Sequence, residues 1–480
     1  MTIQRADARF VLSHPVDSVA VLGPREGWEQ ALAMAGVPIT GIDSGPDLVV
    51  ASTGAAGEAL ASGARSVLVE GRVRARPAPA DPPRRRLLTL PALDEPRLIV
   101  PLDQRASLRY ALGVLARPKA AWKRARNLVL RGLVAAGLQP PGLPTATVAT
   151  TEPGPPSFVA AARDLGVPSD VGWVLALGAN PMSRSAFLLF RPGDADPSWA
   201  LKFSRIPGQT APFDDDERGL GAARAAGGRV AAVAPLLVGR FAVGDLDASL
   251  ETAAAGQPLF DELSTGRRST GLAAVERVAE WTVEVGVQTR AAPSTLEAER
   301  ARLASEVVPR WTSRGAPSDL VDRTLDVPAV FGHGDLWPLN VIGSGSDFSL
   351  IDWENARPHS LPLWDLCFFL TDAATVVEQI PADERDDYVV GLWRGEEALS
   401  ELLFRWLRRA VDAIGVPERA VAPVITLMWL GHGLSSIDRR EALAHPPEPA
   451  TPQQQSPAER LATRWLVEPG LGPSWDRWLR

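Results

Sequence analysis

The chain has 480 residues, of which 45% are hydrophobic and 22% are charged, as is usual for a soluble globular protein. This length predicts two or three domains, because one hydrophobic core rarely serves more than about 250–300 residues. The net charge of −7 argues against a nucleic-acid partner. No export signal and no apolar run of about 20 residues is visible, and the single cysteine, Cys367, excludes an intrachain disulfide. We therefore expect a cytoplasmic protein with no membrane partner.

The N-terminal part alternates short apolar runs with helical segments over residues 16–71. Such alternation predicts a small α/β unit with a largely parallel sheet, and VAVLGPREGWEQ resembles the first strand and helix of a Rossmann-like fold. The full G-x-G-x-x-G pattern is absent, so a structural or substrate-presenting role is favoured over nucleotide binding. A Pro- and Arg-rich break at 73–86, two short strands and a helical stretch at about 103–137 follow. We place this domain at residues 1–138.

The segment 139–157 is rich in Pro, Thr and Gly, which predicts an interdomain linker. Three strands joined by turns follow from residue 171 and define a β-rich lobe at 158–257. The remaining residues, 258–480, show helical spacing of apolar residues and predict an α-rich lobe. A Pro/Gln tract at 445–457 interrupts its helices and is expected to be a surface loop.

The strongest chemical signal is VFGHGDLWPLNVIGSGSDFSLIDWENARP, at residues 330–358. An apolar run ends in His333 and Asp335, Asn340 follows Asp335 by five residues, and a predicted hairpin leads to Asp352. Phosphoryl transfer from Mg-ATP needs a carboxylate that takes the proton of the acceptor hydroxyl, and oxygen ligands that hold the metal. The order and spacing follow those of the protein-kinase catalytic loop and its downstream metal-binding Asp.

HGDLWPLN followed by IDWE resembles the signature of aminoglycoside phosphotransferases, choline kinases and related small-molecule kinases. The resemblance implies a two-lobed, protein kinase-like α+β domain that uses ATP and Mg²⁺. It also implies that Asp335 is the catalytic base and that Asn340 and Asp352 are the magnesium ligands. It further implies that His333 braces the loop and that Asp365 supports it without reacting.

The β-rich lobe is then expected to hold the nucleotide. Lys202 resembles the kinase lysine that contacts the α- and β-phosphates, and lysine is rare in this chain, with three among 50 basic residues. Glu217, in the following helix, resembles its ion-pair partner. The loop at 177–186 is the candidate phosphate-covering loop, with backbone amides that could face a phosphate, and residues 250–253 are the candidate adenine hinge.

The resemblance covers roughly residues 160–440, and the acceptor is expected to be a small molecule with a hydroxyl group. Acid-rich stretches at 381–388 and 395–402 suit a cationic acceptor, although ordinary solvated helix faces are the simpler interpretation. Trp337 and Trp353 either line an acceptor pocket or pack around the loop.

The primary hypothesis is an ATP-dependent phosphotransferase that acts on an amino sugar, a sugar or an amino alcohol. One alternative is a catalytically idle kinase-like scaffold, which is disfavoured because all four key residue types are present. Another is a bifunctional enzyme whose N-terminal domain is an active transferase. No protein partner is expected.

Overall fold

The computed structural model of the protein describes most of the chain, in two compact units. The described residues are 3–23, 26–71, 73, 82–116, 121–136, 138, 142–180, 182–344, 347–443 and 455–468. Unit 1 comprises Met1–Asp214 and Pro235–Gly256, and unit 2 comprises Asp215–Ala234 and Gln257–Arg480.

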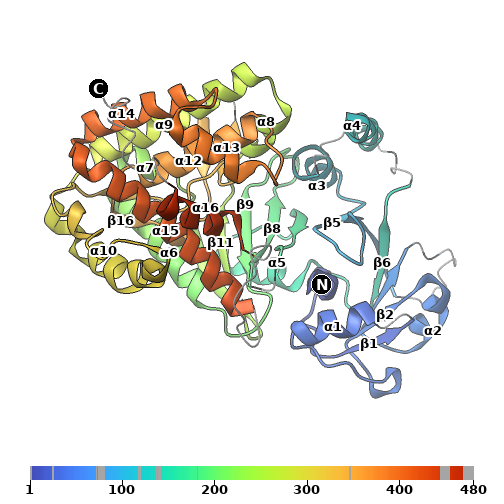
Figure 1. Ribbon diagram of the computed structural model, residues 1–480. Helices are drawn as coiled ribbons and strands as arrows, with labels where there is room; N and C mark the ends of the chain where they lie inside the picture. The colour runs from blue at the N-terminus through green and yellow to red at the C-terminus, as the bar shows by residue number, and fades with distance from the viewer. Residues whose placement is uncertain are drawn as a thin grey trace. The chain divides into compact units, whose positions relative to one another are not determined.

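Unit 1 is built on one sheet of eleven strands (Figure 1). In spatial order these are β1 (Val19–Leu22), β2 (Leu48–Ala51), β3 (Ser66–Glu70), β6 (Thr145–Thr150), β4 (Arg84–Leu90), β5 (Leu98–Pro101), β7 (Gly172–Ala176), β8 (Ser185–Phe190), β9 (Trp199–Phe203), β11 (Leu246–Thr252) and β10 (Leu237–Val243). The pairs β1–β2 and β2–β3 are parallel, and every other pair is antiparallel. The parallel part agrees with the predicted α/β alternation, and β7 to β11 form the predicted β-rich region.

Most helices of unit 1 are short, and α4 (Ala121–Ala135) is the longest of those described. The helices are η1 (Ile3–Val11), α1 (Glu26–Met34), η2 (Ile42–Ser44), η3 (Thr53–Ala55), α2 (Ala56–Ala61), α3 (Arg105–Tyr110), η4 (Ala111–Leu115), α4, α5 (Ser157–Ala161) and η5 (Ala162–Leu165). The 3-10 helix η1 packs Phe10 edge-on against Phe158 and Phe203. The first residues of the chain therefore complete the core beneath the β-rich region.

Two expectations about the first half of the chain differ from the structure. The segment 139–157 contains β6, which lies between β3 and β4 and is largely buried. Its Thr, Ala and Val residues favour a strand, whereas the flanking prolines made the whole segment look like a linker. Residues 1–138 consequently share one continuous sheet with the β-rich region and do not form a compact unit of their own.

Unit 2 is mainly helical, and α9, α12, α13 and α14 lie together in Figure 1. Its helices are most of α6 (Ala211–Ala226), α7 (Gly228–Val233), α8 (Leu259–Thr265), α9 (Arg268–Gln288), η6 (Pro293–Leu296), α10 (Glu297–Arg302), η7 (Leu303–Val307), α11 (Val308–Trp311), η8 (Thr312–Arg314), η9 (Asp322–Thr324), η10 (Trp353–Asn355), α12 (Trp364–Val377), α13 (Arg385–Arg394), α14 (Ser400–Ile414), α15 (Glu418–Leu443) and α16 (Pro457–Val467). The central helix α12 is buried along nearly its whole length. Cys367 on this helix is buried, as expected for a structural thiol.

Two small sheets of unit 2 carry the polar motif. One consists of β12 (Gln257–Pro258), β14 (Val341–Ser344) and β15 (Asp347–Leu350), and the other of β13 (Val330–Gly332) and β16 (Arg357–Ser360). The β14–β15 pair is the predicted hairpin. Most of the Pro/Gln tract and most of the Arg-rich break lie outside the described residues.

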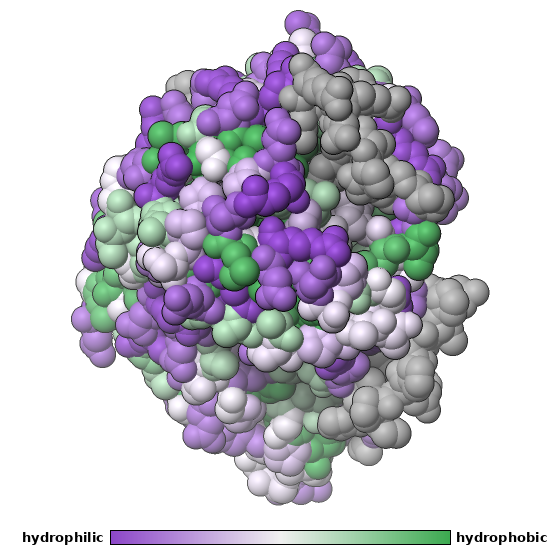
Figure 2. Space-filling model, turned by 60° about the vertical axis from the view of Figure 1, so that its left-hand side comes forward, coloured by the Kyte–Doolittle hydropathy of each residue, from purple (hydrophilic) through white to green (hydrophobic). Residues whose placement is uncertain are grey.

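By length and composition, one helix among the described residues, Glu418–Ala442, could cross a membrane, but 72% of its apolar window is buried inside the protein. Its apolar character is explained by its place in the core of unit 2. In Figure 2, hydrophilic residues cover much of the visible surface, and apolar residues form small separate patches on it.

Candidate active site

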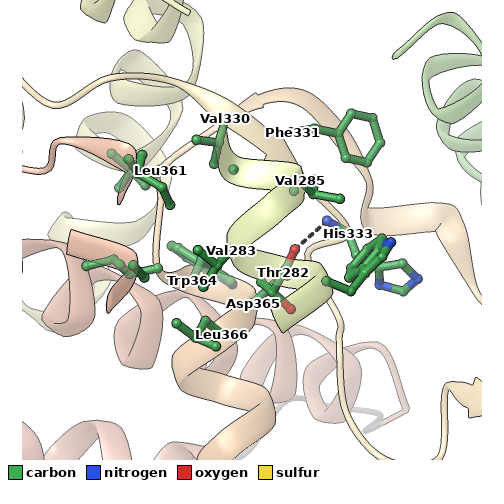
Figure 3. Close-up of a pocket in the computed structure, with 16 residues that line it drawn as sticks. Thr282, Val283, Val285, Val330, Phe331, His333, Leu361, Trp364, Asp365 and Leu366 are labelled. Atoms are coloured by element: carbon green, nitrogen blue, oxygen red, sulfur yellow. Dashed lines mark hydrogen bonds between the residues drawn. The ribbon is translucent and has the colours of Figure 1, made fainter. Parts of the chain in front are cut away.

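The loop that follows β13 is held by the carboxylate of Asp365, at the start of α12. Asp365 Oδ2 accepts a hydrogen bond from His333 N at 2.6 Å, and Oδ1 accepts one from Gly334 N at 2.9 Å. Figure 3 shows Asp365 and His333 at the edge of an apolar pocket lined by residues such as Val285 and Leu361. Burial raises the pKa of Asp365, while the two backbone donors and His333 oppose that shift. Asp365 thus positions the loop backbone, as predicted.

His333 connects this loop to the strand that leads to Asp352. Its Nε2 lies 3.1 Å from the carbonyl oxygen of Ile351, and its ring packs edge-on against Trp353 with centroids 4.8 Å apart. Burial lowers the pKa of the imidazole, so the neutral form, with Nε2–H donating to Ile351, is favoured. These contacts agree with the bracing role predicted for His333.

Asn340 closes the loop on Asp335. Its Nδ2 donates to the backbone oxygen of Asp335 at 2.9 Å and to Oδ2 of the Asp335 side chain at 3.3 Å. The backbone oxygen of Asn340 accepts from Ile351 N at 3.0 Å. Two of the predicted site residues are therefore in direct contact, and the amide oxygen of Asn340 stays available for another partner.

Asp335 is electrostatically coupled to Asp352. The pKa of Asp335 is raised to about 7, mainly by burial and then by the negative charges of Asp352 and Glu354, while Arg439 and Asn340 oppose the shift. Repulsion between two carboxylates of this kind diminishes when a cation binds beside them. The structure thus brings together Asp335, Asn340 and Asp352.

The segment at Asp352 is fixed by a residue that the sequence did not single out. Asp352 has a left-handed backbone, with φ of 63°, which is uncommon for a residue other than glycine. Directly after it, Trp353 N donates to Oδ1 of Asp216 at 3.2 Å, and Trp353 Nε1 donates to the Leu350 carbonyl at 2.8 Å. Asp216 is 2% exposed, and a buried acid among the four acidic residues of that helix carries no signal in the sequence alone.

A close helix approach supports the same segment. A Cβ atom placed on Gly219 of α6 would lie 1.9 Å from the carbonyl oxygen of Trp353. Only glycine allows this approach. Helix α6 therefore positions the Asp352 segment through one side chain, Asp216, and through the absence of another at Gly219.

The donors at this site fit a magnesium ion. Among the described residues no group of three or more His, Cys, Asp or Glu could hold a metal by itself. Mg²⁺ usually takes only one or two protein carboxylates and completes its shell with substrate phosphates and water. The hard oxygen donors of Asn340 and Asp352, next to the coupled carboxylate of Asp335, match that requirement.

In unit 1, Lys202 lies on β9 and is 9% exposed. Its Nζ lies 3.0 Å from Oε1 of Glu251 on the neighbouring strand β11. Glu251 is 2% exposed, so the buried ammonium has an acidic partner within the sheet. Glu217, predicted as that partner, lies in α6 with an exposed side chain, and its role stays a prediction. Sequence reasoning placed Glu251 in the candidate hinge and missed its pairing with Lys202.

The candidate phosphate-covering loop connects β7 to β8. Met182 N and Ser183 N donate to Oδ1 of Asn180 at 3.0 and 2.9 Å, and Gly178 N donates to Ser185 Oγ at 3.2 Å. The amides of Met182 and Ser183, which the sequence suggested could face a phosphate, are thus bonded within the loop. A Cβ on Gly178 would lie 2.7 Å from the carbonyl oxygen of Arg184, so the tight loop requires glycine there.

The carbonyl groups of the same loop are held by a buried ion pair. Arg205 donates to the carbonyl oxygens of Gly178, at 3.1 Å, and Asn180, and its Nε donates to Asp7 Oδ2 at 2.8 Å. Asp7 and Arg205 are both fully buried. Gln4, also on η1, donates to the Gly178 carbonyl at 2.8 Å. Two side chains from the first helix of the chain therefore help to set the loop.

Two of the features that suggested an acceptor site have structural partners. Trp353 is fully buried, which favours the packing role over a cage for a cationic group. In the acid-rich stretch of α13, Asp386 and Asp387 form ion pairs with Arg460 and Arg464 of α16. These acids stabilise helix packing and do not by themselves indicate a cationic acceptor.

No family model and no curated protein matches this sequence. Its structure is similar to those of small-molecule phosphotransferases. A thermostable mutant of aminoglycoside phosphotransferase APH(4)-Ia, solved with ADP and hygromycin B, is 14% identical over 64% of this chain and 98% of its own, with a TM-score of 0.39. Aminoglycoside phosphotransferase APH(3'')-Id from Streptomyces rimosus is 16% identical over 54% of this chain and 96% of its own, with a TM-score of 0.31. A glucosamine kinase bound to glucosamine, ADP and phosphate is 13% identical over 62% of this chain and 82% of its own, with a TM-score of 0.34. Because the TM-scores are below 0.5, the interpretation of the site depends on its own geometry.

Proposed function

We propose that the protein is an ATP-dependent phosphotransferase that moves the γ-phosphate of Mg-ATP to a hydroxyl group of a small molecule. The observation that carries this proposal is the carboxylate of Asp335, which is bonded by Asn340 and coupled to Asp352. A pKa raised to about 7 is suited to a general base, because such a group is largely ionised near neutral pH and still holds a proton well.

In the proposed reaction Asp335 accepts the proton of the acceptor hydroxyl. The hydroxyl oxygen forms a bond to the γ-phosphorus in line with the leaving group, the bond between that phosphorus and the bridging oxygen breaks, and ADP departs. The bonds that Asp365 makes to His333 N and Gly334 N fix the backbone directly before Asp335. A base held in this way does not need to be reorganised when the acceptor binds.

Asn340 and Asp352 would hold Mg²⁺, which neutralises phosphate charge when it is bound. Lys202 would contact the nucleotide phosphates, and its ion pair with Glu251 holds the buried ammonium in place. Glu217 is proposed to assist Lys202, as the resemblance implies. The acceptor is proposed to be an amino sugar, a sugar or an amino alcohol.

The direct test is ADP formation by the purified protein with Mg-ATP and a panel of sugars, amino sugars and amino alcohols. An acceptor-dependent signal is expected, and Asp352→Ala should abolish magnesium-dependent nucleotide binding because it removes a metal ligand. Asp383→Ala, which removes an exposed acid elsewhere in unit 2, is the matched control and should retain both properties. Unchanged Mg-ATP affinity in Asp352→Ala would contradict the metal assignment.

A wild-type protein that binds no nucleotide would contradict the proposed function as a whole. That result would favour the alternative in which the fold serves as a binding or scaffold module. Nucleotide binding without turnover on the panel would direct the search to other hydroxyl compounds.

A further inference from the structure

One long stretch of this acidic chain is strongly basic. Residues 104–151 contain eight basic residues and no Asp or Glu, so the rest of the chain carries a net charge of −15. The basic residues are Arg105, Arg109, Arg117, Lys119, Lys123, Arg124, Arg126 and Arg131. Charge asymmetry of this size within one protein indicates a surface for an anionic partner.

Helix α4, at the centre of this stretch, packs one of its faces against the rest of unit 1. Leu130 and Val134 are buried in a core cluster with Leu112. Asn127 Nδ2 donates to the backbone oxygens of Leu112, at 3.1 Å, and Ala116. The position of α4 on unit 1 is therefore specified by packing and by hydrogen bonds.

The other face of α4 presents large apolar side chains to solvent. Trp122, Leu128 and Val129 are 64%, 68% and 63% exposed, and Leu138, just after the helix, is 57% exposed. Single exposed apolar residues are ordinary on a protein surface, but three on one helix face form a surface that water solvates poorly. Arg126 flanks this face, with its guanidinium 5.8 Å from the centre of the Trp122 ring.

We propose that α4 docks on a membrane surface that contains anionic lipid. A helix with basic residues beside exposed Trp, Leu and Val lies in the interface, where the apolar side chains enter the acyl boundary and the basic ones face the headgroups. The proposal differs from the sequence expectation of no membrane partner, which depended on the absence of a spanning segment. It is independent of the proposed phosphotransferase activity.

Two other partners fit the same surface less well. Nucleic acid would neutralise the basic charge but would leave Trp122, Leu128 and Val129 uncovered against a polar phosphate backbone. A second copy of the chain would cover the apolar face but would bring two strongly basic stretches together. An anionic lipid surface satisfies both the charge and the apolar side chains.

The test is flotation of the full chain with vesicles of pure phosphatidylglycerol or pure phosphatidylcholine. Binding to phosphatidylglycerol alone is expected, and it should weaken as salt is added. The variant Lys123→Gln, Arg124→Gln, Arg126→Gln should reduce the partition coefficient by roughly 100-fold. Each basic residue near an anionic surface raises this coefficient about fivefold, and the variant removes three of them. Arg405→Gln with Arg409→Gln removes two exposed arginines of α14 and should leave binding unchanged.

A second variant tests the apolar face. Trp122→Gln, Leu128→Gln, Val129→Gln keeps the charge and should also weaken binding at least tenfold, while Val467→Gln, at an apolar residue that is 62% exposed, should have no effect. Full retention of vesicle binding by the apolar variant would overturn the proposal. So would binding of duplex DNA without vesicle binding, or a wild-type oligomer that dissociates in the apolar variant.

Discussion

The Asp335 loop of unit 2 and the loop between β7 and β8 of unit 1 differ in how far along the chain their supports lie. The Asp335 loop is held by Asn340, five residues away, and by Asp365, 31 to 32 residues away from the two amides that it binds. The loop between β7 and β8 is held by Gln4, which is 174 residues from Gly178 in the sequence. It is also held by Arg205, whose ion-pair partner Asp7 is 198 residues from Arg205. One loop is assembled from neighbouring sequence, and the other needs the first helix of the chain.

This difference explains which loop could be recognised from the sequence. Local supports keep a fixed spacing, so they appear as a motif such as HGDLWPLN followed by IDWE. Distant supports such as Asp7 and Arg205 have no fixed spacing and look like ordinary charged residues. The following predictions test the two kinds of support, from the largest expected effect to the smallest.

The first prediction concerns chemistry at the locally supported loop. Asp335→Asn should lower turnover by about 10²–10⁴-fold, because it removes the proposed base and keeps its shape. Nucleotide affinity should stay close to that of the wild type, and the midpoint of thermal unfolding near neutral pH should not fall, because the variant buries no carboxylate charge. Turnover within a few-fold of the wild type in an acceptor-dependent assay would show that another group takes the proton.

The second prediction concerns the distant support. Asp7→Ala should lower the free energy of unfolding by about 3–5 kcal/mol, because it leaves the guanidinium of Arg205 buried without its ion-pair partner. Urea denaturation is the measurement. Glu152→Ala breaks the exposed pair with Arg65 and should change little, because surface ion pairs contribute little to stability. Equal effects of the two substitutions would contradict the importance of the buried pair.

The third prediction concerns the close approach of α6 to Trp353. Gly219→Ala should destabilise the protein by about 1–3 kcal/mol, because the new methyl group would overlap a backbone carbonyl that cannot rotate away. A Cβ on Gly221, in the same helix, would meet no atom within 4 Å. Gly221→Ala should therefore be neutral or stabilising by up to about 1 kcal/mol. If both substitutions destabilise the protein, the cause lies in helix α6 as a whole and not in its contact with Trp353.

The fourth prediction concerns pH. Because the pKa of Asp335 is raised to about 7, kcat/KM should fall about tenfold for each pH unit below 7, as the base becomes protonated. The unfolded chain loses this proton near pH 3.8, so between about pH 4 and 7 the folded state binds more protons. Stability should therefore fall as pH rises through that window. The slope of the free energy of unfolding against pH should be less steep in Asp335→Asn. An unchanged slope would mean that other groups cause the pH dependence.

Much of the fold could be predicted from the sequence. The strands at β1 to β5, the three strands β7 to β9 and the β14–β15 hairpin were expected, because apolar runs with turn residues between them are local signals. The strand β6 was missed, because a short Thr-, Ala- and Val-containing run between prolines resembles a linker. One of the short apolar runs within residues 16–71, at 37–42, forms only an isolated bridge, between Ile39 and Val19.

The sequence by itself determined which chemical groups are present and their order: a carboxylate, an amide and a second carboxylate around a hairpin, with a lysine on an earlier strand. Only the tertiary structure decided that Asp216 fixes the Asp352 segment, that Glu251 pairs with Lys202 and that Asp7 holds Arg205. The physical reason is burial. An acid and a base that are removed from water must find each other, but which residues become buried together depends on the packing of distant segments.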